Sequence, residues 1–574
     1  MKRLFALSAL LLIGGCQTLV PPASEPAVPV EESASEAPEP TRAQGSFSQE
    51  TLYSLLVAEL AGQRNRFDIA LGNYVQQANA TQDPGVAERA FRIAEYLGAE
   101  QAALDTALIW AANAPEDLDA QRAAAIQLAR AGQYEQSLDY MERVLRRQGD
   151  THFDFLALSA ARTDPDTRDG LLQSFERLLQ RYPDTPQLVF GKALLLEQDD
   201  RPHDALTLLE GQPRAERPVP SILLHARILQ VLDRGDEALP LLRRSLPQHP
   251  DDKRLRLAYA RLLVESDQFE AAIGEFSTLL QQNPADDDLR FSLALVCMEA
   301  EAWKEAIVYL EDLIARGSHV NAAQFNLGRA HEALGNTRRA LDAYSRVAPG
   351  NEYLAAKSLQ TKLLLDNNRG EEAATLLQRA RQSQPDYAIQ LYLLEIEALS
   401  EQGRLELAEQ RIDQALEQFP EELNLLYTRA MLAEKRGDLQ QLEADLRFIL
   451  DREPENAMAL NALGYTLADR TVRFEEALAL IEKAHQLNPE DPAILDSMGW
   501  IQYRLGNHQE AERWLREAFE RYPDAEIAAH LGEVLWTQGQ RREARRIWSQ
   551  AYQNEPDSPI LRDTLRRLTG SETL

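Results

Sequence analysis

The sequence predicts an all-α chain in which about 15 helix–turn–helix units stack into one superhelical solenoid. A spacing of 33 to 35 residues recurs between alanine-rich positions over most of the 574 residues, and such a period is typical of a repeat array. Ten of these intervals also carry a proline at the same offset. The chain contains 44% hydrophobic and 26% charged residues, which excludes a collagen-like or wholly disordered chain.

The chain is strongly acidic and poor in cysteine. Lys and Arg number 61 against 91 Asp and Glu, a formal net charge of −30, so we exclude nucleic-acid binding through a general basic surface. The two cysteines, Cys16 and Cys297, are too few for a disulfide framework or a four-thiolate metal site. Cys297 is expected to be a buried, inert thiol on the inner face of a first helix.

Residues 1–15 are predicted to be a lipoprotein signal peptide. A basic start precedes a ten-residue apolar run, which is too short for a bilayer span of about 20 residues and is typical of an export signal. The run ends in Gly14, Gly15 and Cys16. This ending resembles the lipobox of bacterial lipoproteins, which implies that Cys16 is lipidated and becomes the first mature residue. An ordinary cleaved signal that contains a cysteine is the alternative.

Residues 16–46 are predicted to be a flexible tether behind the lipidated Cys16. The segment combines six prolines with Ala, Ser and Glu, a composition that cannot bury a core. Gln17 follows the cysteine, and in the lipoprotein family a residue other than Asp there implies sorting to the outer membrane. The expected location is therefore the outer membrane, lipid-anchored and facing the periplasm. No other apolar run approaches 18 residues, so no membrane-spanning helix is expected.

Residues 47–556 are predicted to form the solenoid. Each interval has one anchor position, and twelve of fifteen anchors are alanine, which would let the second helix of a unit lie close against the first. The anchors are Ala70, Ala103, Ser137, Leu171, Ala205, Ala238, Ala272, Ala306, Ala340, Ala373, Ala408, Leu442, Ala477, Ala511 and Ala544. Because no unit can bury its own apolar stripe, neighbouring units must stack.

Glycine and proline complete the pattern. Gly499 and Gly532 each lie 12 residues before their anchors, where a missing side chain would allow close approach from the first helix. A proline 12 residues after the anchor would end the second helix. It occurs at Pro115, Pro183, Pro250, Pro284, Pro385, Pro420, Pro454, Pro489, Pro523 and Pro556.

This spacing resembles the tetratricopeptide repeat from about Thr51 to Pro556. The likeness is strongest at Gly328/Ala340, Gly464/Ala477, Gly499/Ala511 and Gly532/Ala544, and it is weaker before about Asp200. Residues 557–574 are predicted to be a capping helix and tail. That helix starts at Ser558-Pro559 and stops at Gly570, and its Arg562, Arg566 and Arg567 suit a solvent-facing surface.

The sequence offers no catalytic motif. It contains no Gly-rich phosphate loop ending in Gly-Lys-Ser/Thr, no His-Glu-x-x-His and no Gly-x-Ser-x-Gly. The nine histidines are scattered singly. We therefore predict that the protein is not an enzyme and that it has neither a cofactor nor a metal ion.

In tetratricopeptide folds the first helices line a concave groove, and the resemblance assigns groove positions to this chain. In the middle repeats one of these positions gives a mostly basic line and another gives an apolar line beside it, which would suit an extended peptide with acidic or carboxylate groups. The alternative is that they pair with neighbouring Glu and Asp or pack between repeats. The residues singled out for partner binding are Arg227, Arg261, Phe291, Phe325, Arg329 and Lys362.

The same positions place four large aromatic residues in the last repeats. They are Tyr465, Trp500, Tyr503 and Trp536. Trp and Tyr are frequent anchors of protein interfaces, so these side chains are further candidates for partner binding. Structural stacking between helices explains them equally well.

The layout resembles long tetratricopeptide lipoproteins of Gram-negative outer membranes. One group of these serves as adaptors that deliver cell-wall hydrolases to a periplasmic carboxy-terminal processing protease, a serine protease. The resemblance therefore implies a non-catalytic adaptor with protein partners, anchored by a lipid. The alternative is a scaffold for assembling exopolysaccharide export, pili or outer-membrane proteins. Self-association is also open, because the end repeats of a solenoid need capping.

Overall fold

The computed structural model describes residues 47–147, 149, 151–183, 185–213 and 217–571. Every regular element within these ranges is helical, with 31 α-helices and two short 3-10 segments. The predicted all-α fold is therefore confirmed. The expected signal peptide, Cys16 and the tether up to residue 46 lie outside the described residues.

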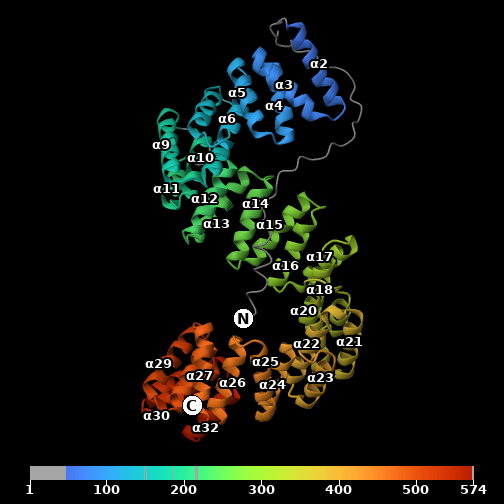
Figure 1. Ribbon diagram of the computed structural model, residues 1–574, viewed down its shortest axis with the longest axis vertical. Helices are drawn as coiled ribbons and strands as arrows, with labels where there is room; N and C mark the ends of the chain where they lie inside the picture. Colours follow the sequence, from blue (N-terminus) through green and yellow to red (C-terminus); the bar gives the residue numbers. More distant parts are fainter. Residues whose placement is uncertain (1–46, 148, 150, 184, 214–216, 572–574) are drawn as a thin grey trace. The chain divides into compact units, whose positions relative to one another are not determined.

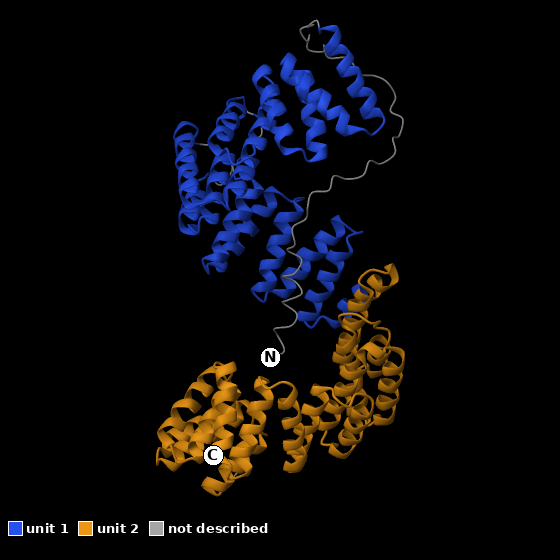
Figure 2. Cartoon of the chain, in the orientation of Figure 1, with its two compact units in different colours: residues 1–309 blue, residues 310–574 orange. Residues whose placement is uncertain are grey.

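The chain divides into two compact units, residues 1–309 and 310–574 (Figure 2). Within each unit consecutive helices lie side by side in chain order (Figure 1), as expected when each repeat contacts only its neighbours. No helix in the ranges given above is long and apolar enough to cross a membrane.

Unit 1 contains helices α2 to α16. Their bounds are α2 Gln49–Gln63, α3 Phe67–Thr81, α4 Pro84–Leu97, α5 Glu100–Asn113, α6 Leu118–Arg130, α7 Tyr134–Arg146, α8 Phe153–Ala160, α9 Pro165–Arg181, α10 Pro186–Gln198, α11 Pro202–Glu210, α12 Val219–Val231, α13 Gly235–Ser245, α14 Lys253–Glu265, α15 Phe269–Gln282 and α16 Asp287–Glu299. Helix α17, Trp303–Arg316, contains the division between the units.

Unit 2 contains helices α18 to α32. Their bounds are α18 Val320–Ala333, α19 Thr337–Ser345, α20 Tyr353–Asp366, α21 Gly370–Ser383, α22 Ala388–Glu401, α23 Leu405–Gln418, α24 Leu423–Arg436, α25 Leu439–Arg452, α26 Ala457–Arg470, α27 Phe474–Leu487, α28 Pro492–Arg504, α29 His508–Arg521, α30 Ala525–Thr537, α31 Arg541–Asn554 and α32 Pro559–Thr569.

The anchor positions lie in the core, on the second helix of each pair. All fifteen are buried, and Ala477, Ala511 and Ala544 have no exposed surface. The prolines that follow lie just beyond the second helices: α27 ends two residues before Pro489, and α29 two before Pro523. Proline lacks the amide hydrogen that would continue the helix, so the predicted ending signal is confirmed.

Glycine sits where paired helices approach most closely. A Cβ on Gly464 would lie 2.6 Å from Ile481 Cγ1, well inside van der Waals contact. A Cβ on Gly499 would overlap Leu515, and one on Gly532 would overlap the Trp548 indole. A side chain at any of these three positions would therefore force the neighbouring helix to shift.

The C-terminal helix α32 caps the solenoid, as the sequence predicts. Leu561 and Leu565 are fully buried among the last repeat's core residues, and Gly570 ends the helix with φ 78°, which favours glycine. One expectation needs correction. The Arg567 guanidinium does not simply face solvent, because it pairs with the buried carboxylate of Glu533 on α30.

Candidate binding groove of unit 2

The first helices α24, α26, α28 and α30 line a cavity of about 450 Å³ in unit 2. Tyr427 and Met431 reach it from α24, and Met458 and Tyr465 from α26. The apolar stripe of each helix faces its neighbours, so these groove side chains occupy the remaining surface. The cavity therefore lies where the resemblance places a partner-binding groove.

A chain of polar contacts crosses the groove from α26 through α30 to α28. The Tyr465 hydroxyl donates to Glu526 Oε1 at 3.0 Å and lies 3.3 Å from His530 Nε2. On the other edge of the ring, His530 Nδ1 lies 2.9 Å from Asp496 Oδ2. Tyr465 has one proton to donate, so its oxygen is left to accept from Nε2–H, and a doubly protonated imidazolium satisfies every contact.

The charges of this network shift its pKa values in a consistent way. Burial alone would lower the pKa of His530, but the charge and hydrogen bond of Asp496 outweigh it, so the pKa is raised. Burial raises the pKa of the Glu526 carboxyl, and burial together with Glu526 raises that of Tyr465. The network thus favours a charged imidazolium between acidic neighbours.

Trp500 forms the floor beneath His530. The two rings stack with centroids 4.2 Å apart and planes 24° from parallel, and Trp500 Nε1 donates to Asp469 Oδ1 at 3.2 Å. Only 6% of Trp500 is exposed. Trp500 is thus packed beneath the network and does not line the cavity.

Tyr503 and Trp536 do not line this cavity, and of the four predicted aromatic residues only Tyr465 does. The Tyr503 hydroxyl donates to Glu533 Oε1 at 3.2 Å, and Tyr503 also packs 5.2 Å from Trp500. Trp536 is half-buried against Trp548, with ring centroids 5.6 Å apart. Arg541 lies over the Trp536 ring at 5.1 Å, within the usual range of a cation–π contact.

The groove is acidic as well as aromatic. Asp491, Asp496, Asp524 and Glu526 line it together with Glu434, whose pKa is raised by burial. This acidity differs from the basic line predicted for the middle repeats. A cationic or donor-rich segment with apolar side chains would complement these walls.

The residues predicted in the middle repeats fall in both units. Arg227 Nη2 pairs with Glu197 Oε2 at 2.6 Å, as the alternative interpretation expected, while Arg261 and Phe291 are half-buried. These three belong to unit 1.

The other three predicted residues belong to unit 2. Arg329 Nη1 donates to Asn326 Oδ1 at 3.2 Å, and Lys362 is exposed. Phe325 packs against Tyr344 with ring centroids 6.2 Å apart, among buried residues. Partner binding by any of the ten predicted residues stays a prediction.

Sequence reasoning missed the buried charges that link neighbouring helices. Glu395 on α22 lies 2.7 Å from both Arg381 of α21 and Arg411 of α23, and Asp445 pairs with Arg429 at 2.6 Å. His530 and Asp496 form a similar pair across α28 and α30. Each pair joins residues at least 14 positions apart, and no local motif marks them. Cys297, by contrast, is buried as expected, and burial raises the pKa of its thiol to about 11.

Comparison with known proteins agrees with this architecture. Family models of the tetratricopeptide repeat match residues 233–295 and 473–533 in one version, and 298–353, 360–422, 393–441 and 427–492 in another. Two solved structures with low superposition scores are the type IV pilus biogenesis factor PilW and yeast Tom70. PilW is 17% identical with a TM-score of 0.30, over 38% of this chain and 100% of its own. Tom70 is 14% identical with a TM-score of 0.29, over 90% and 99%.

Two curated proteins match in sequence. Bacteriophage adsorption protein A of Escherichia coli is 28% identical over 114 residues, which is 20% of this chain and 11% of that protein. The TPR repeat-containing protein PA4667 of Pseudomonas aeruginosa is 67% identical over 572 residues, covering 100% of this chain and 97% of its own length. Since this match spans both units, the chain belongs to the family of tetratricopeptide-repeat proteins.

Proposed function

We propose that this protein is a non-catalytic adaptor of the bacterial envelope that holds a protein segment in the groove of unit 2. Tetratricopeptide repeats are in general protein-interaction scaffolds, and the groove supports that role here. The observation that carries the proposal is the network of Tyr465, Glu526, His530 and Asp496 across three helices. It fixes the groove wall before a partner arrives, which reduces the ordering cost of binding.

The segment bound in the groove is basic or rich in donors and has apolar side chains. Its charge would complement the acidic wall, and its apolar groups would pack on Met431, Met458 and Tyr522, of which Met458 is 63% and Tyr522 48% exposed. Methionine adapts its shape to different partners, as an adaptor with several clients requires.

The partners that the lipoprotein resemblance suggests are a periplasmic carboxy-terminal processing protease and the cell-wall hydrolases that it cleaves. A lipid on Cys16 would hold the adaptor in the outer membrane, facing the periplasm, and raise the local concentration of whatever it binds. The anchored adaptor would then bring the protease and its substrate together without taking part in the cleavage reaction.

The test is a crosslinked pull-down of the native protein from envelopes, with the captured proteins identified by mass spectrometry. Recovery of a serine protease together with cell-wall hydrolases is the expected result. Recovery of export, pilus or outer-membrane assembly proteins without a protease would overturn the protease assignment and favour an assembly scaffold.

The groove itself is tested by replacing its exposed side chains. The double variant Met458→Ala with Tyr522→Ala should reduce captured partner roughly tenfold, since hot-spot side chains dominate binding. A matched control changes two exposed side chains outside the cavity, Val472→Ala and Tyr96→Ala, which are 85% and 74% exposed. Equal capture by both double variants would exclude the groove as the binding surface.

Lipid anchoring is tested separately. Cys16→Ser should abolish metabolic labelling by a fatty acid and release the protein from the membrane fraction. Labelling that persists in Cys16→Ser would show that the lipoprotein proposal is wrong.

A further inference from the structure

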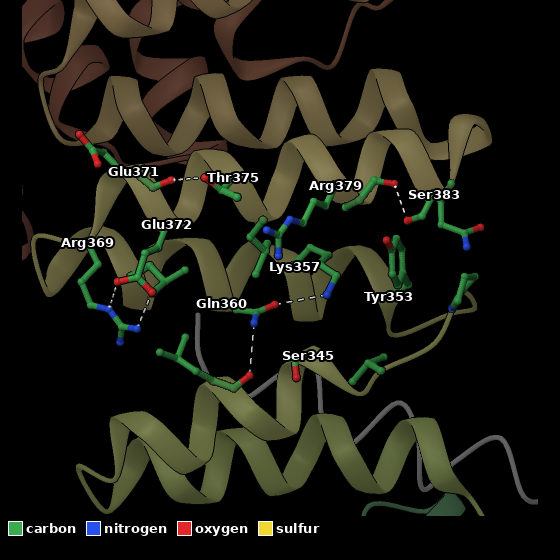
Figure 3. Close-up of a pocket in the computed structure, with 17 residues that line it drawn as sticks. Ser345, Tyr353, Lys357, Gln360, Arg369, Glu371, Glu372, Thr375, Arg379 and Ser383 are labelled. Carbon is green, nitrogen blue, oxygen red and sulfur yellow. Dashed lines mark hydrogen bonds and ion pairs between the residues drawn. The ribbon is translucent and has the colours of Figure 1, made fainter.

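A second cavity lies in unit 2 between the second helices α19 and α21, with α20 as its floor (Figure 3). Its volume is about 850 Å³. The cavity exists because α19 has 9 residues, whereas the second helix α21 has 14. Pro349 lies nine residues after the anchor Ala340 rather than 12, so the helix ends early and leaves a space beside α21.

A buried lysine points into this space from the floor. Lys357 is 7% exposed, between Tyr353 and Gln360, which are each 4% exposed. Its Nζ donates to Gln360 Oε1 at 3.3 Å and lies 5.4 Å from the centroid of the Tyr353 ring. Gln360 is held in turn, because its Nε2 donates to the Leu341 carbonyl oxygen at 3.2 Å.

The Lys357 ammonium has no carboxylate partner in the described part of the chain. A buried ammonium is costly unless an anion offsets its lost hydration, and burial lowers the pKa of Lys357 accordingly. Figure 3 shows the Arg379 guanidinium directed from α21 into the same space. Two cations thus face an open volume that an anion could occupy.

The remaining charges limit the ligand to one negative charge. Arg369 pairs with Glu372 at 2.7 Å at one end of the cavity, and Glu371 lies at that same end (Figure 3). Three cationic and two anionic side chains therefore line the cavity, which leaves one positive charge in excess. A monoanion balances it, whereas a phosphate dianion would face Glu371 and Glu372 with surplus charge.

The walls between the charges are apolar. Leu341, Val347, Leu364, Leu376 and Ala380 line the cavity, and Val347 and Leu364 are buried. We propose that this cavity binds a monocarboxylate with an apolar substituent, its carboxylate held by Lys357 and Arg379 and its apolar group against these walls. The carboxylate belongs either to a free small acid or to the C-terminal residue of a peptide.

This site is separate from the groove. The groove is lined by the first helices α24, α26, α28 and α30. The cavity proposed to bind a carboxylate, called the carboxylate cavity below, opens between the second helices α19 and α21. The proposal therefore goes beyond the adaptor function and does not depend on it.

The full chain is titrated with N-acetyl-leucine, N-acetyl-leucinamide and inorganic phosphate by ligand-observed NMR. N-acetyl-leucine should bind, and the neutral amide should bind at least about tenfold more weakly, because it lacks the charge-assisted hydrogen bonds. Equal binding of acid and amide, or tighter binding of phosphate, would overturn the proposal.

Two variants locate the binding. Lys357→Met keeps the length of the side chain, and Arg379→Gln changes an exposed side chain. Each should weaken N-acetyl-leucine binding at least about tenfold. Arg338→Gln, which changes an exposed cation on the neighbouring helix α19 outside the cavity, is the matched control and should leave N-acetyl-leucine binding unchanged. The folding of Arg379→Gln is checked by circular dichroism. If this variant binds N-acetyl-leucine as tightly as the unmodified chain does, the proposed binding site is wrong.

A further experiment with peptides distinguishes the two sources of carboxylate. A hexapeptide ending in leucine is compared with the same peptide carrying a C-terminal amide. Binding of the free-acid peptide at least as tight as that of N-acetyl-leucine supports a peptide terminus as the ligand, and binding of N-acetyl-leucine alone supports a free small acid. Tight binding of the amidated peptide would contradict both.

Discussion

His530 and Asp496 form a buried ion pair, with Nδ1 and Oδ2 2.9 Å apart on adjacent first helices of the C-terminal repeats. The pair is 34 residues apart in sequence, one repeat length. It joins α28 to α30 next to the cavity wall, so the geometry of the groove and the stability of the last repeats depend on the same contact.

The stability of unit 2 should fall as the pH rises above about 6.5. The pKa of His530 is raised in the folded protein, so the folded state holds this proton more tightly than the unfolded chain does. The contribution of His530 to stability is complete below the pKa of an unfolded histidine, about 6.5. This contribution is lost as the pH rises through the pKa of His530 in the folded protein. NMR titration of the His530 Cε1–H signal should give a pKa above about 6.5.

Two variants check the cause. His530→Gln should remove this part of the pH dependence from thermal unfolding curves. Asp496→Asn should lower the pKa of His530, because only the charges of Glu526 and Asp469 would then oppose the effect of burial. A folded-state titration of His530 at or below about 6.5 in the unmodified chain would contradict the assignment.

Gly532→Ala should destabilise unit 2, because the new Cβ would overlap the buried indole of Trp548. Overpacking of a filled core costs about 1–3 kcal/mol. Chemical denaturation followed by circular dichroism measures the change. Gly274→Ala is the control, because a Cβ added at Gly274 would have no atom within 4 Å and alanine there should be neutral or stabilising. Similar losses in both variants would mean that the overlap with Trp548 is not the cause, because alanine has a higher helix propensity than glycine.

The elements that sequence predicted well are those with a local physical cause. Anchors such as Ala511, close-approach glycines such as Gly532 and the helix-ending Pro523 each act within one repeat, so their spacing is visible in the chain. The same logic predicted the cap at Gly570. The burial of Cys297 followed from its place on a first helix.

The features that sequence did not reveal depend on contacts between repeats. Glu395 and Asp496 look like solvated charges in the sequence, and only the stacking of neighbouring helices buries them. The carboxylate cavity had a visible signal, because Pro349 breaks the spacing of the other prolines. Its consequence for Lys357 could not be deduced without knowing which helix would cover the gap.

Glu395→Ala should cost about 3 kcal/mol or more of unfolding free energy, because removing one partner of a buried ion pair leaves the others uncompensated. The carboxylate is 4% exposed and accepts from Arg381 and Arg411, whose side chains are 10% and 26% exposed. Urea denaturation of the full chain measures the loss.

The control for Glu395 is the exposed pair Glu510–Arg513, in which both side chains are 57% exposed. Glu510→Ala should change stability little, since surface ion pairs contribute weakly. If Glu395→Ala and Glu510→Ala unfold at the same urea concentration, the buried carboxylate of Glu395 does not stabilise the packing of the repeats.

Helix α2 should mediate self-association of the chain. Leu52, Leu56 and Leu60 lie on one helical stripe and are 55%, 59% and 44% exposed, whereas the other end of the solenoid is closed by α32. A stripe of this kind favours burial against another apolar surface, and a second copy offers the same stripe. Sedimentation of the Cys16→Ser chain should show a concentration-dependent dimer, and Leu56→Lys should shift it to monomer. Val308→Lys, at a side chain that is 63% exposed, is the matched control and should leave the dimer intact. If the Cys16→Ser chain without a further substitution is a monomer at all concentrations, α2 is not a self-association surface.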